Sequence, residues 1–444
     1  MKIVIAGSGE VGTHLAKLLS REEQDITVVD NDSEKLAMLD ANYNLLTSRG
    51  STTSFEALRQ AGVEGCDLFI AVTPFEAQNI VSCAIAKSLG AEKTVARIDN
   101  YEYNDPVNRD FFHHIGADDV IYPEYLAALE IVQALKHNWV RHWFELHDGE
   151  LILVGVKLRD NAPLVGVQLK ELGMSSHNFH VAAIKRNHET IIPRGDDRLE
   201  SNDIVYFMTK REHVDELIPL CGKTERKIKD VLIMGGSRIA IRLCAIAGEK
   251  YNFKIMDVDR ERCLKLSERC QNAKIIHADA RDTDALRDAG ISDMDAFIAL
   301  ADSSETNILT CLTAKEFGVI KTIAEVENLQ FISEAEGLNI GTVINKKLLA
   351  SSRIFQMLLD RDTSTSKCLA LADAEVAEIE AKEGSKITRG PVKDLRLSRD
   401  MTIAGLIRDG KGFLVSGNTV IRPGDRVVVF TLNGVIHKVE KLFK

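Results

Sequence analysis

Three glycines near the N-terminus, Gly7, Gly9 and Gly12, have the spacing G-x-G-x-x-G. An apolar run over residues 2–6 precedes them and an amphipathic helix pattern follows at once, which is the context that a dinucleotide-binding loop requires. In such a loop the first glycine permits a tight turn, the second lets the backbone approach a pyrophosphate, and the third lets helix and strand pack closely. The N–H groups at the start of the helix then face the anion. The residues expected to bind it are Gly7, Ser8, Gly9, Glu10 and Val11.

A second apolar run ends in Asp30, at the distance downstream where a carboxylate meets the ribose hydroxyls of a dinucleotide. A carboxylate at that place repels a 2′-phosphate, so the position favours NAD over NADP. A glycine turn with a purely structural role is the alternative interpretation of the loop. The strand before the loop, the helix after it and Asp30 together favour nucleotide binding.

From residue 2 to about residue 137, short apolar runs alternate with helix patterns, which predicts a parallel, doubly wound sheet. The predicted strands are residues 2–6, 26–30, 44–47, 68–72, 94–98 and 120–122. Ligands of such sheets bind at the carboxyl ends of the strands, and the further candidates there are Ser51, Thr73, Pro74 and Arg97. Arg97 offers a fork of donors to a phosphate, and a solvated surface arginine is an equally good interpretation.

The same series of patterns returns later in the chain at a fixed offset of 228 positions, which is the distance from Gly7 to Gly235. Further pairs at this offset are Leu58 and Leu286, Arg59 and Arg287, Thr73 and Ala301, Asn79 and Asn307, Arg97 and Glu325, and Pro163 and Pro391. An offset that holds at several separated points indicates an internal duplication.

The second copy of the glycine loop is altered, because Ser237 replaces the middle glycine and Ala240 the third. A Cβ at Ser237 hinders the approach of a pyrophosphate, and Glu325, in the place of Arg97, repels one. Asp257 nevertheless ends the second strand of this half, and a cation stands beside the helix start. Nucleotide binding and a scaffold role therefore both stay open. The candidate binding residues here are Gly235, Gly236, Ser237, Arg238, Ile239 and Asp257.

Each α/β region is followed by a shorter one in which strands are separated by turn clusters. We therefore predict an α/β protein with two Rossmann-like doubly wound parallel sheets, each followed by a small α+β domain, in tandem duplication. The expected domains are 1–137 and 228–362, which would bind nucleotides, and 138–222 and 363–444, which are the small ones. The helix predicted over residues 125–139 has a wide apolar face, which suits a contact with a second subunit or packing on its own sheet.

The chain carries a net charge of −10 and 6% aromatic residues without a basic stripe, so nucleic acid and anionic lipid are poor partners. No apolar run approaches the roughly 18 residues that span a bilayer. A strand is expected from Lys2 onward, which leaves no room for a signal peptide, and we expect a cytoplasmic protein. The eight scattered cysteines suit free, buried thiols of a reducing compartment, and no His/Cys spacing indicates a metal site.

No His, Lys or Tyr cluster that would act as acid or base of a dehydrogenase is visible beside either loop. Duplicated binding units without catalytic residues suit a sensor, in which a ligand binds two arrangements of an assembly with different affinity. We therefore expect that the protein is not an enzyme. An NAD-dependent oxidoreductase with duplicated Rossmann domains is the alternative, and a third interpretation makes both nucleotide folds purely structural.

The tandem layout, the first glycine loop, Asp30, the Thr73-x₅-Asn79 segment and the turn at residues 422–425 resemble the TrkA family of Trk-system potassium uptake proteins over the whole chain. The resemblance implies two RCK units, each with a KTN (TrkA-N) domain followed by a TrkA-C domain. It also implies a regulatory subunit that lies in the cytoplasm, peripheral to the inner face of the cell membrane and without insertion into it. Its partner would be a membrane potassium transporter of the TrkH/TrkG type.

Members of this family assemble KTN domains into rings and bind NAD(H), with ATP and ADP also acting on the system, so the resemblance implies a homo-oligomer, a dimer or higher. By residue matching, the implied binding positions are residues 7–11, Asp30, Thr73, Pro74 and Arg97, with residues 235–239 and Asp257 in the second half. Glu10 stands where single-unit relatives that respond to ATP often carry arginine, and this departure favours NAD(H) at the first site.

Overall fold

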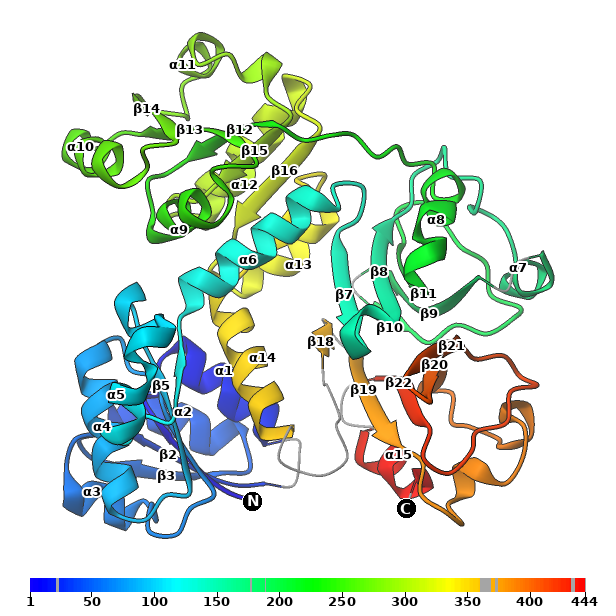
Figure 1. Cartoon of the computed structure of the whole chain (residues 1–444), viewed down its shortest axis with the longest axis horizontal. Coiled ribbons are helices and arrows are strands. Elements are labelled where there is room, and N and C mark those ends of the chain that lie inside the picture. The colour runs from blue at the N-terminus through cyan, green and yellow to red at the C-terminus, as the bar shows by residue number, and fades with distance from the viewer. Residues whose placement is uncertain are drawn as a thin grey trace. The chain divides into compact units, whose positions relative to one another are not determined.

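The strand that precedes the first glycine loop, β1 (Lys2–Ala6), lies inside a six-stranded parallel sheet with the order β3-β2-β1-β4-β5-β6. Figure 1 labels β2, β3 and β5 of this sheet. The structure is a computed structural model, and it describes residues 1–20, 24–175, 178–187, 189–359, 369–371, 374–432 and 436–443. The other strands of this sheet are β2 (Asp25–Asp30), β3 (Leu46–Arg49), β4 (Leu68–Ala71), β5 (Lys93–Arg97) and β6 (Asp119–Ile121). The strand order reverses between β1 and β4, so the carboxyl ends of these two strands form the switch point at which ligands of such sheets bind.

Helices alternate with these strands: α1 (Glu10–Leu19), α2 (Ser33–Asn42), α3 (Phe55–Gln60), α4 (Glu76–Ser88), α5 (Arg109–His114) and α6 (Pro123–Lys136). Short polar side chains start two of them, because Asp32 accepts from the first N–H groups of α2 and Ser54 accepts from α3. Val11, Leu15 and Leu19 recur at helical spacing and are buried, which holds α1 against the sheet.

The second half repeats this arrangement in a parallel sheet with the order β14-β13-β12-β15-β16-β17. Its strands are β12 (Asp230–Met234), β13 (Asn252–Asp257), β14 (Ala273–His277), β15 (Ala296–Ala299), β16 (Lys321–Glu325) and β17 (Thr342–Ile344). Its helices are α9 (Arg238–Ala247), α10 (Arg260–Arg269), α11 (Thr283–Asp288), α12 (Ser304–Glu316), α13 (Gln330–Gly337) and α14 (Lys346–Leu359).

Each parallel sheet is followed in the chain by a small antiparallel one. The first has the order β10-β9-β11-β8-β7, with β7 (His142–Leu146), β8 (Leu151–Lys157), β9 (Phe179–Arg186), β10 (Glu189–Ile191), β11 (Ile204–Thr209), α7 (Leu169–Ser175) and α8 (Val214–Leu220). The second has the order β18-β19-β22-β20-β21, with β18 (Leu369–Leu371), β19 (Ala374–Glu380), β20 (Met401–Arg408), β21 (Lys411–Leu414), β22 (Arg426–Leu432) and α15 (Ile436–Phe443).

The two small sheets share one hydrophobic core. Buried side chains of the first sheet, among them Leu153 and Tyr206, pack in one cluster with Ala404, Val428 and Phe430 of the second. Polar contacts accompany this packing, since Arg194 donates from Nη2 to the carbonyl oxygen of residue 398 at 2.7 Å. The small domains are therefore joined within one chain.

The chain forms two compact units whose boundaries do not follow the duplication. Unit 1 comprises Met1–Ala127 together with Lys346–Leu358, which is nearly all of α14. Unit 2 comprises Ala128–Asn345 and Leu359–Lys444. The first parallel sheet is thus completed by a helix that the duplication assigns to the second half, while α6 passes into unit 2 from Ala128 onward.

The predicted fold class is confirmed: two Rossmann-like parallel sheets alternate with two small α+β regions in tandem. The strand expected over residues 44–47 begins two residues later, as β3, and the sequence did not predict the strands β7, β10, β18, β19, β20 and β21 of the small sheets. All seven described cysteines are free and buried, and Cys368 lies outside the described residues. No helix among the described residues is long and apolar enough to cross a membrane.

Candidate functional site

The first and third glycines of the N-terminal loop are required by the fold itself. Gly7 has φ +112°, and a Cβ on it would lie 3.0 Å from the backbone nitrogen of Thr73. A Cβ on Gly12 would lie 1.9 Å from the carbonyl oxygen of Gly7. The lack of a side chain at these two glycines lets the start of α1 approach the ends of β1 and β4 closely, at the switch point of the sheet.

The middle glycine is different, because no contact with the described residues requires a glycine there. Gly9 has φ −66° and ψ −178°, which any residue adopts, and a Cβ on it would meet nothing within 4 Å. It is the N-cap of α1, and no side chain caps the N–H groups of the first turn. The space in front of this helix start is therefore open, and free N–H groups at a helix N-terminus attract an anion.

Asp30, at the end of β2, fixes the glycine loop through hydrogen bonds to backbone N–H groups. Its Oδ2 accepts from the N–H of Ser8 at 2.6 Å, and its Oδ1 accepts from the N–H of Asp32 at 2.9 Å. Burial alone would raise the pKa of Asp30, but these backbone hydrogen bonds lower it below its ordinary value. Gly50, just before Ser51, donates its N–H to the carbonyl oxygen of Asp30 at 3.0 Å, so the ends of β2 and β3 meet here.

A buried amide connects the ends of β4 and β5. Asn79 accepts at Oδ1 from the N–H of Thr73 at 2.9 Å and donates from Nδ2 to the carbonyl oxygens of Thr73 at 3.0 Å and Arg97 at 2.9 Å. Asn307 makes the same contacts in the second half, with residues 301 and 325 as partners. The two asparagines that occupy equivalent positions in the repeat thus have the same structural role, which is to connect two neighbouring strand ends. Pro74, which follows Thr73, is exposed.

Replacing this amide with leucine is expected to destabilise the half that contains it. Asn79→Leu leaves the N–H of residue 73 and two buried carbonyl groups without their partner, which costs about 3 kcal/mol. Hydrogen exchange of peptides covering β4 and β5 measures the loss locally. Asn307→Leu is the matched variant, and it should accelerate exchange in β15 and β16 instead. Unchanged exchange in both variants would contradict a bracing role.

Charged side chains gather at the carboxyl end of β5. Arg97 donates from Nη2 to Asp99 Oδ1 at 3.2 Å, so part of the fork expected to bind a phosphate is already engaged. Glu76, in the first turn of α4, accepts from the N–H groups of Asp99 at 2.8 Å and of the next residue at 2.7 Å. Burial raises the pKa of Glu124, at the start of α6, while Lys346 and Arg97 nearby oppose this shift. Glu76 and Glu124 had no signal in the sequence patterns.

Lys347 is a further residue that sequence patterns missed at this site. It lies in α14 and forms an ion pair with Glu10, the first residue of α1, although 337 positions separate them. The carboxylate of Glu10 beside the open helix start is therefore compensated by a cation from the second half of the chain. No local pattern in the sequence connects these two positions.

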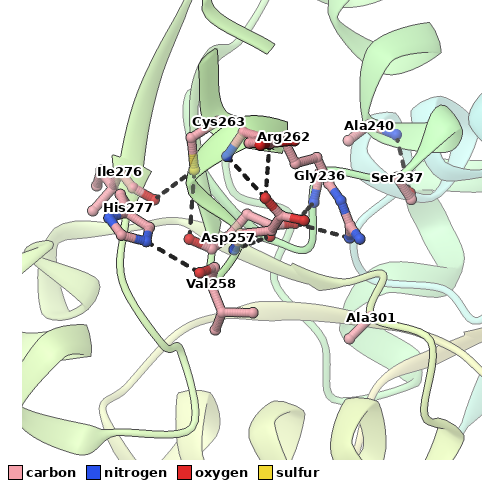
Figure 2. A network of polar contacts seen from close by, with 12 residues as sticks. Gly236, Ser237, Ala240, Asp257, Val258, Arg262, Cys263, Ile276, His277 and Ala301 are labelled. Carbon is pink, nitrogen blue, oxygen red and sulfur yellow. Dashed lines mark hydrogen bonds and ion pairs between the residues drawn. The ribbon is translucent and has the colours of Figure 1, made fainter. Parts of the chain in front are cut away.

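The second glycine loop is filled by its own side chains (Figure 2). Asp257 accepts from the N–H of Gly236 at 2.6 Å, as Asp30 does from Ser8, but it also receives Nη1 of Arg262 at 3.3 Å. The hydroxyl of Ser237 accepts from the N–H of Ala240 at 3.5 Å and so caps α9. Arg238 is exposed and Ile239 is buried. The carboxylate and the helix start that a nucleotide would use thus have partners within the chain.

Known protein families and proteins match the whole of this arrangement. The TrkA-N domain model matches residues 3–123 and again 231–346, and the TrkA-C domain model matches 153–222 and again 376–444. The Trk system potassium uptake protein TrkA of Halomonas elongata is 32% identical, with 100% of this chain and 99% of the relative covered. The chain belongs to the TrkA family. TrkA of Azorhizobium caulinodans is 30% identical with the same coverage. The resemblance drawn from the sequence is confirmed.

Solved structures of the GsuK channel share this fold. The GsuK channel superposes with a TM-score of 0.60 at 16% identity, covering 99% of this chain and 78% of that one. A structure described as the GsuK channel bound to NAD gives 0.58 at 16% identity and covers 100% of this chain and 78% of that one. At this identity the likeness shows the fold alone.

Proposed function

We propose that the chain is the NAD(H)-binding regulatory subunit of a Trk-type potassium uptake system, with its nucleotide site at the first glycine loop. The observation that carries the proposal is the open space at Gly9, a glycine that neither its backbone angles nor its neighbours require. It lies at an uncapped helix start beside a carboxylate, at the switch point of a parallel sheet.

The proposed contacts follow from the donors and acceptors at this place. The pyrophosphate takes the N–H groups of residues 9–11, and the ribose hydroxyls donate to Asp30. An ionised carboxylate has about four acceptor sites, so the hydrogen bonds from Ser8 and Asp32 leave Asp30 further sites for a ligand. Thr73 and Pro74 form the opposite wall, with Ser51 and Arg97 at the neighbouring strand ends. Structures of the GsuK channel bound to NAD and bound to ADP share the fold and support NAD(H), with ADP as a further ligand. We also propose ATP as a ligand.

For the second loop we propose a scaffold role, with residues 235–239 and Asp257 held by contacts inside the chain. Ser237 caps α9, and Arg262 occupies the carboxylate that a ribose would need. One nucleotide site per chain follows from this assignment.

The ligand acts by shifting a population and is not transformed. A nucleotide with different affinity for two arrangements of an RCK ring changes their ratio, and about 1–3 kcal/mol of coupling suffices for regulation. We propose a homo-oligomer of this chain on the cytoplasmic face of a TrkH/TrkG-type transporter, peripheral to the membrane. The net charge of −10 suits the Lys- and Arg-rich cytoplasmic loops of such a partner. The four-domain division at 1–137, 138–222, 228–362 and 363–444 is part of this proposal.

Calorimetric titration of the full chain with NADH, NAD, ATP and ADP tests the assignment. Asp30→Asn should weaken NADH binding at least about tenfold, because it removes a charged acceptor worth about 1.5–3 kcal/mol. Asp257→Asn is the matched control, since Asp257 makes the same two backbone contacts in the second loop. An equal loss of NADH affinity in both variants would mean that the substitutions act by destabilising the fold. Unchanged NADH affinity in Asp30→Asn would show that the first loop is not the binding site.

A further inference from the structure

Unit 2 contains a cavity of about 240 Å³ that is lined by cations, and no residue of either glycine loop is among its lining residues. Its walls come from residues 138–141 just before β7, from the end of β8 and Arg159 after it, from residues 222–224, from the ends of α12, β16 and β17, and from the residues just before these two strands. Six basic residues line it: Arg141, Lys157, Arg159, Lys223, Lys315 and Lys321. No acidic residue is among the lining residues, although the whole chain has a net charge of −10.

Part of this cluster has a structural role. Arg141 donates to the carbonyl oxygen of residue 336 at 2.9 Å and Lys157 to that of residue 337 at 3.0 Å, which places both cations at the C-terminal end of α13. Lys321 donates to the carbonyl oxygen of Val140 at 3.0 Å, and Arg159 donates to Asn339. These acceptors are neutral, so they satisfy hydrogen bonds without cancelling the charges.

The two remaining lysines are not explained by the fold. The side-chain ammonium groups of Lys223 and Lys315 form no hydrogen bond or ion pair with any residue that the structure describes. Two carboxylates face cations of the cluster: Glu336, which receives Lys185 at 2.5 Å and also faces Arg141, and Glu130 of α6, which faces Lys321. The cavity therefore has more positive charge than its surroundings balance.

Burial makes this excess costly. Lys157 is 7% exposed and Lys321 is 4% exposed. Burial, with neighbouring cations, lowers the pKa of Lys321 to about 7 and the pKa values of Lys157 and Lys315 to about 8. An anion that enters the cavity lowers the free energy of these buried charges, because it replaces their lost solvation and reduces the repulsion among the cations.

We propose that this cavity binds a compact, polyvalent oxyanion of the phosphate class, held by its two arginines and four lysines. Guanidinium groups match phosphate oxygens with two parallel hydrogen bonds, and ammonium groups add point charges. The volume lies below the roughly 300–1,000 Å³ of sites for larger organic ligands, which favours a phosphate or pyrophosphate over a whole dinucleotide. The one aromatic lining residue, Trp139, packs in the core beside β8, so no ring is free to stack on a base.

Two sources supply this chemistry: free inorganic pyrophosphate and the phosphate tail of a nucleotide. Titration of the full chain with pyrophosphate and with ADP, at constant ionic strength in KCl, separates them. ADP binding that survives Asp30→Asn but is lost with the cavity lysines identifies a nucleotide tail, whereas binding of pyrophosphate alone identifies the free anion. Either result supports the cavity as an oxyanion site, independently of the first glycine loop.

The decisive variant is the double substitution Lys223→Gln and Lys315→Gln, because neither side chain holds the fold together by a hydrogen bond. Its matched control replaces two exposed lysines of the same half, Lys250→Gln and Lys265→Gln, with the same change in net charge. We expect one pyrophosphate site per chain that weakens at least tenfold in the cavity variant and stays unchanged in the control. No binding of either anion to the wild type, or equal weakening in both variants, overturns the proposal.

The same site predicts a pH dependence. Bound anion stabilises the charged lysines, so affinity should fall as pH rises through the pKa values of Lys321, Lys157 and Lys315, between about 7 and 9. The other charged groups that face them are Arg141, Arg159, Lys223, Glu130 and Glu336. Sulfate is the suitable probe because its own charge does not change in this range. A flat sulfate affinity from pH 7 to pH 9 would contradict the role of these lysines.

Discussion

Replacing Gly9 with serine is expected to weaken NADH binding about 10-fold to 100-fold while leaving the chain as stable as the wild type. The backbone angles of Gly9 suit any residue, and a Cβ there meets no atom within 4 Å, so the fold accepts the substitution. The new hydroxyl can cap α1 as Ser237 caps α9, which adds a few tenths of a kcal/mol. The same side chain fills the space of a pyrophosphate and takes an N–H group whose charged hydrogen bond is worth about 1.5–3 kcal/mol.

Calorimetric titration with NADH and thermal unfolding, done on the same preparation, measure the two effects of Gly9→Ser separately. The reciprocal variant Ser237→Gly is the control, because it removes the cap of α9 and should lower stability slightly without changing NADH affinity. Wild-type affinity in Gly9→Ser would show that the nucleotide does not approach this backbone, and the site would have to be sought elsewhere.

Replacing Gly12 with alanine is expected to lower the stability of the protein, unlike Gly9→Ser, which is expected to lower NADH affinity. The added Cβ would lie 1.9 Å from the carbonyl oxygen of Gly7 and 3.0 Å from its carbonyl carbon. Gly7 cannot move away, because it is held against the backbone of Thr73 in a left-handed conformation. Overpacking against backbone atoms costs about 1–3 kcal/mol or more, so we expect a loss of about 3 kcal/mol in unit 1.

Hydrogen exchange localises this loss, which should appear in peptides from residues 1–127 and not in those from the second parallel sheet. Ala240→Gly is the matched variant, since residue 240 takes the place of Gly12 in the second loop and tolerates a Cβ there. It should change stability by at most about 1 kcal/mol. Wild-type protection in Gly12→Ala would mean that α1 shifts along the sheet to accept the methyl group.

Much of this architecture could be predicted from the sequence because its determinants are local. Apolar runs predicted the strands of the first parallel sheet, the repeat predicted a second sheet of the same kind, and the glycine spacing predicted the turn between β1 and α1. The offset of the duplication placed Asn79 on Asn307, and the structure shows that both amides make the same three contacts. Local backbone conformation and the position of a residue within a repeat can both be predicted from the order of residues in the sequence.

The contacts that complete the candidate sites could not be predicted, because they join residues far apart in the chain. Lys347 reaches Glu10 across 337 positions, and the cations of the oxyanion cavity come both from segments before the second parallel sheet and from α12 and β16 within that half. Arg262 lies only five positions after Asp257, but its pairing depends on the direction that its side chain takes from α10. Short edge strands such as β10 carry too few residues for a pattern.

Unit 1 is built from two segments that lie far apart in the chain, so they are synthesised at different times. A ribosome completes Met1–Ala127 long before it reaches Lys346–Leu358, yet both segments belong to the same compact unit. At about 5–20 residues per second, the early part of the unit waits on the order of ten seconds or more for its last helix. During that interval the face that α14 later covers is open to chaperones or to a second nascent chain. Unit 1 can therefore reach its final packing only after residue 358 has been synthesised.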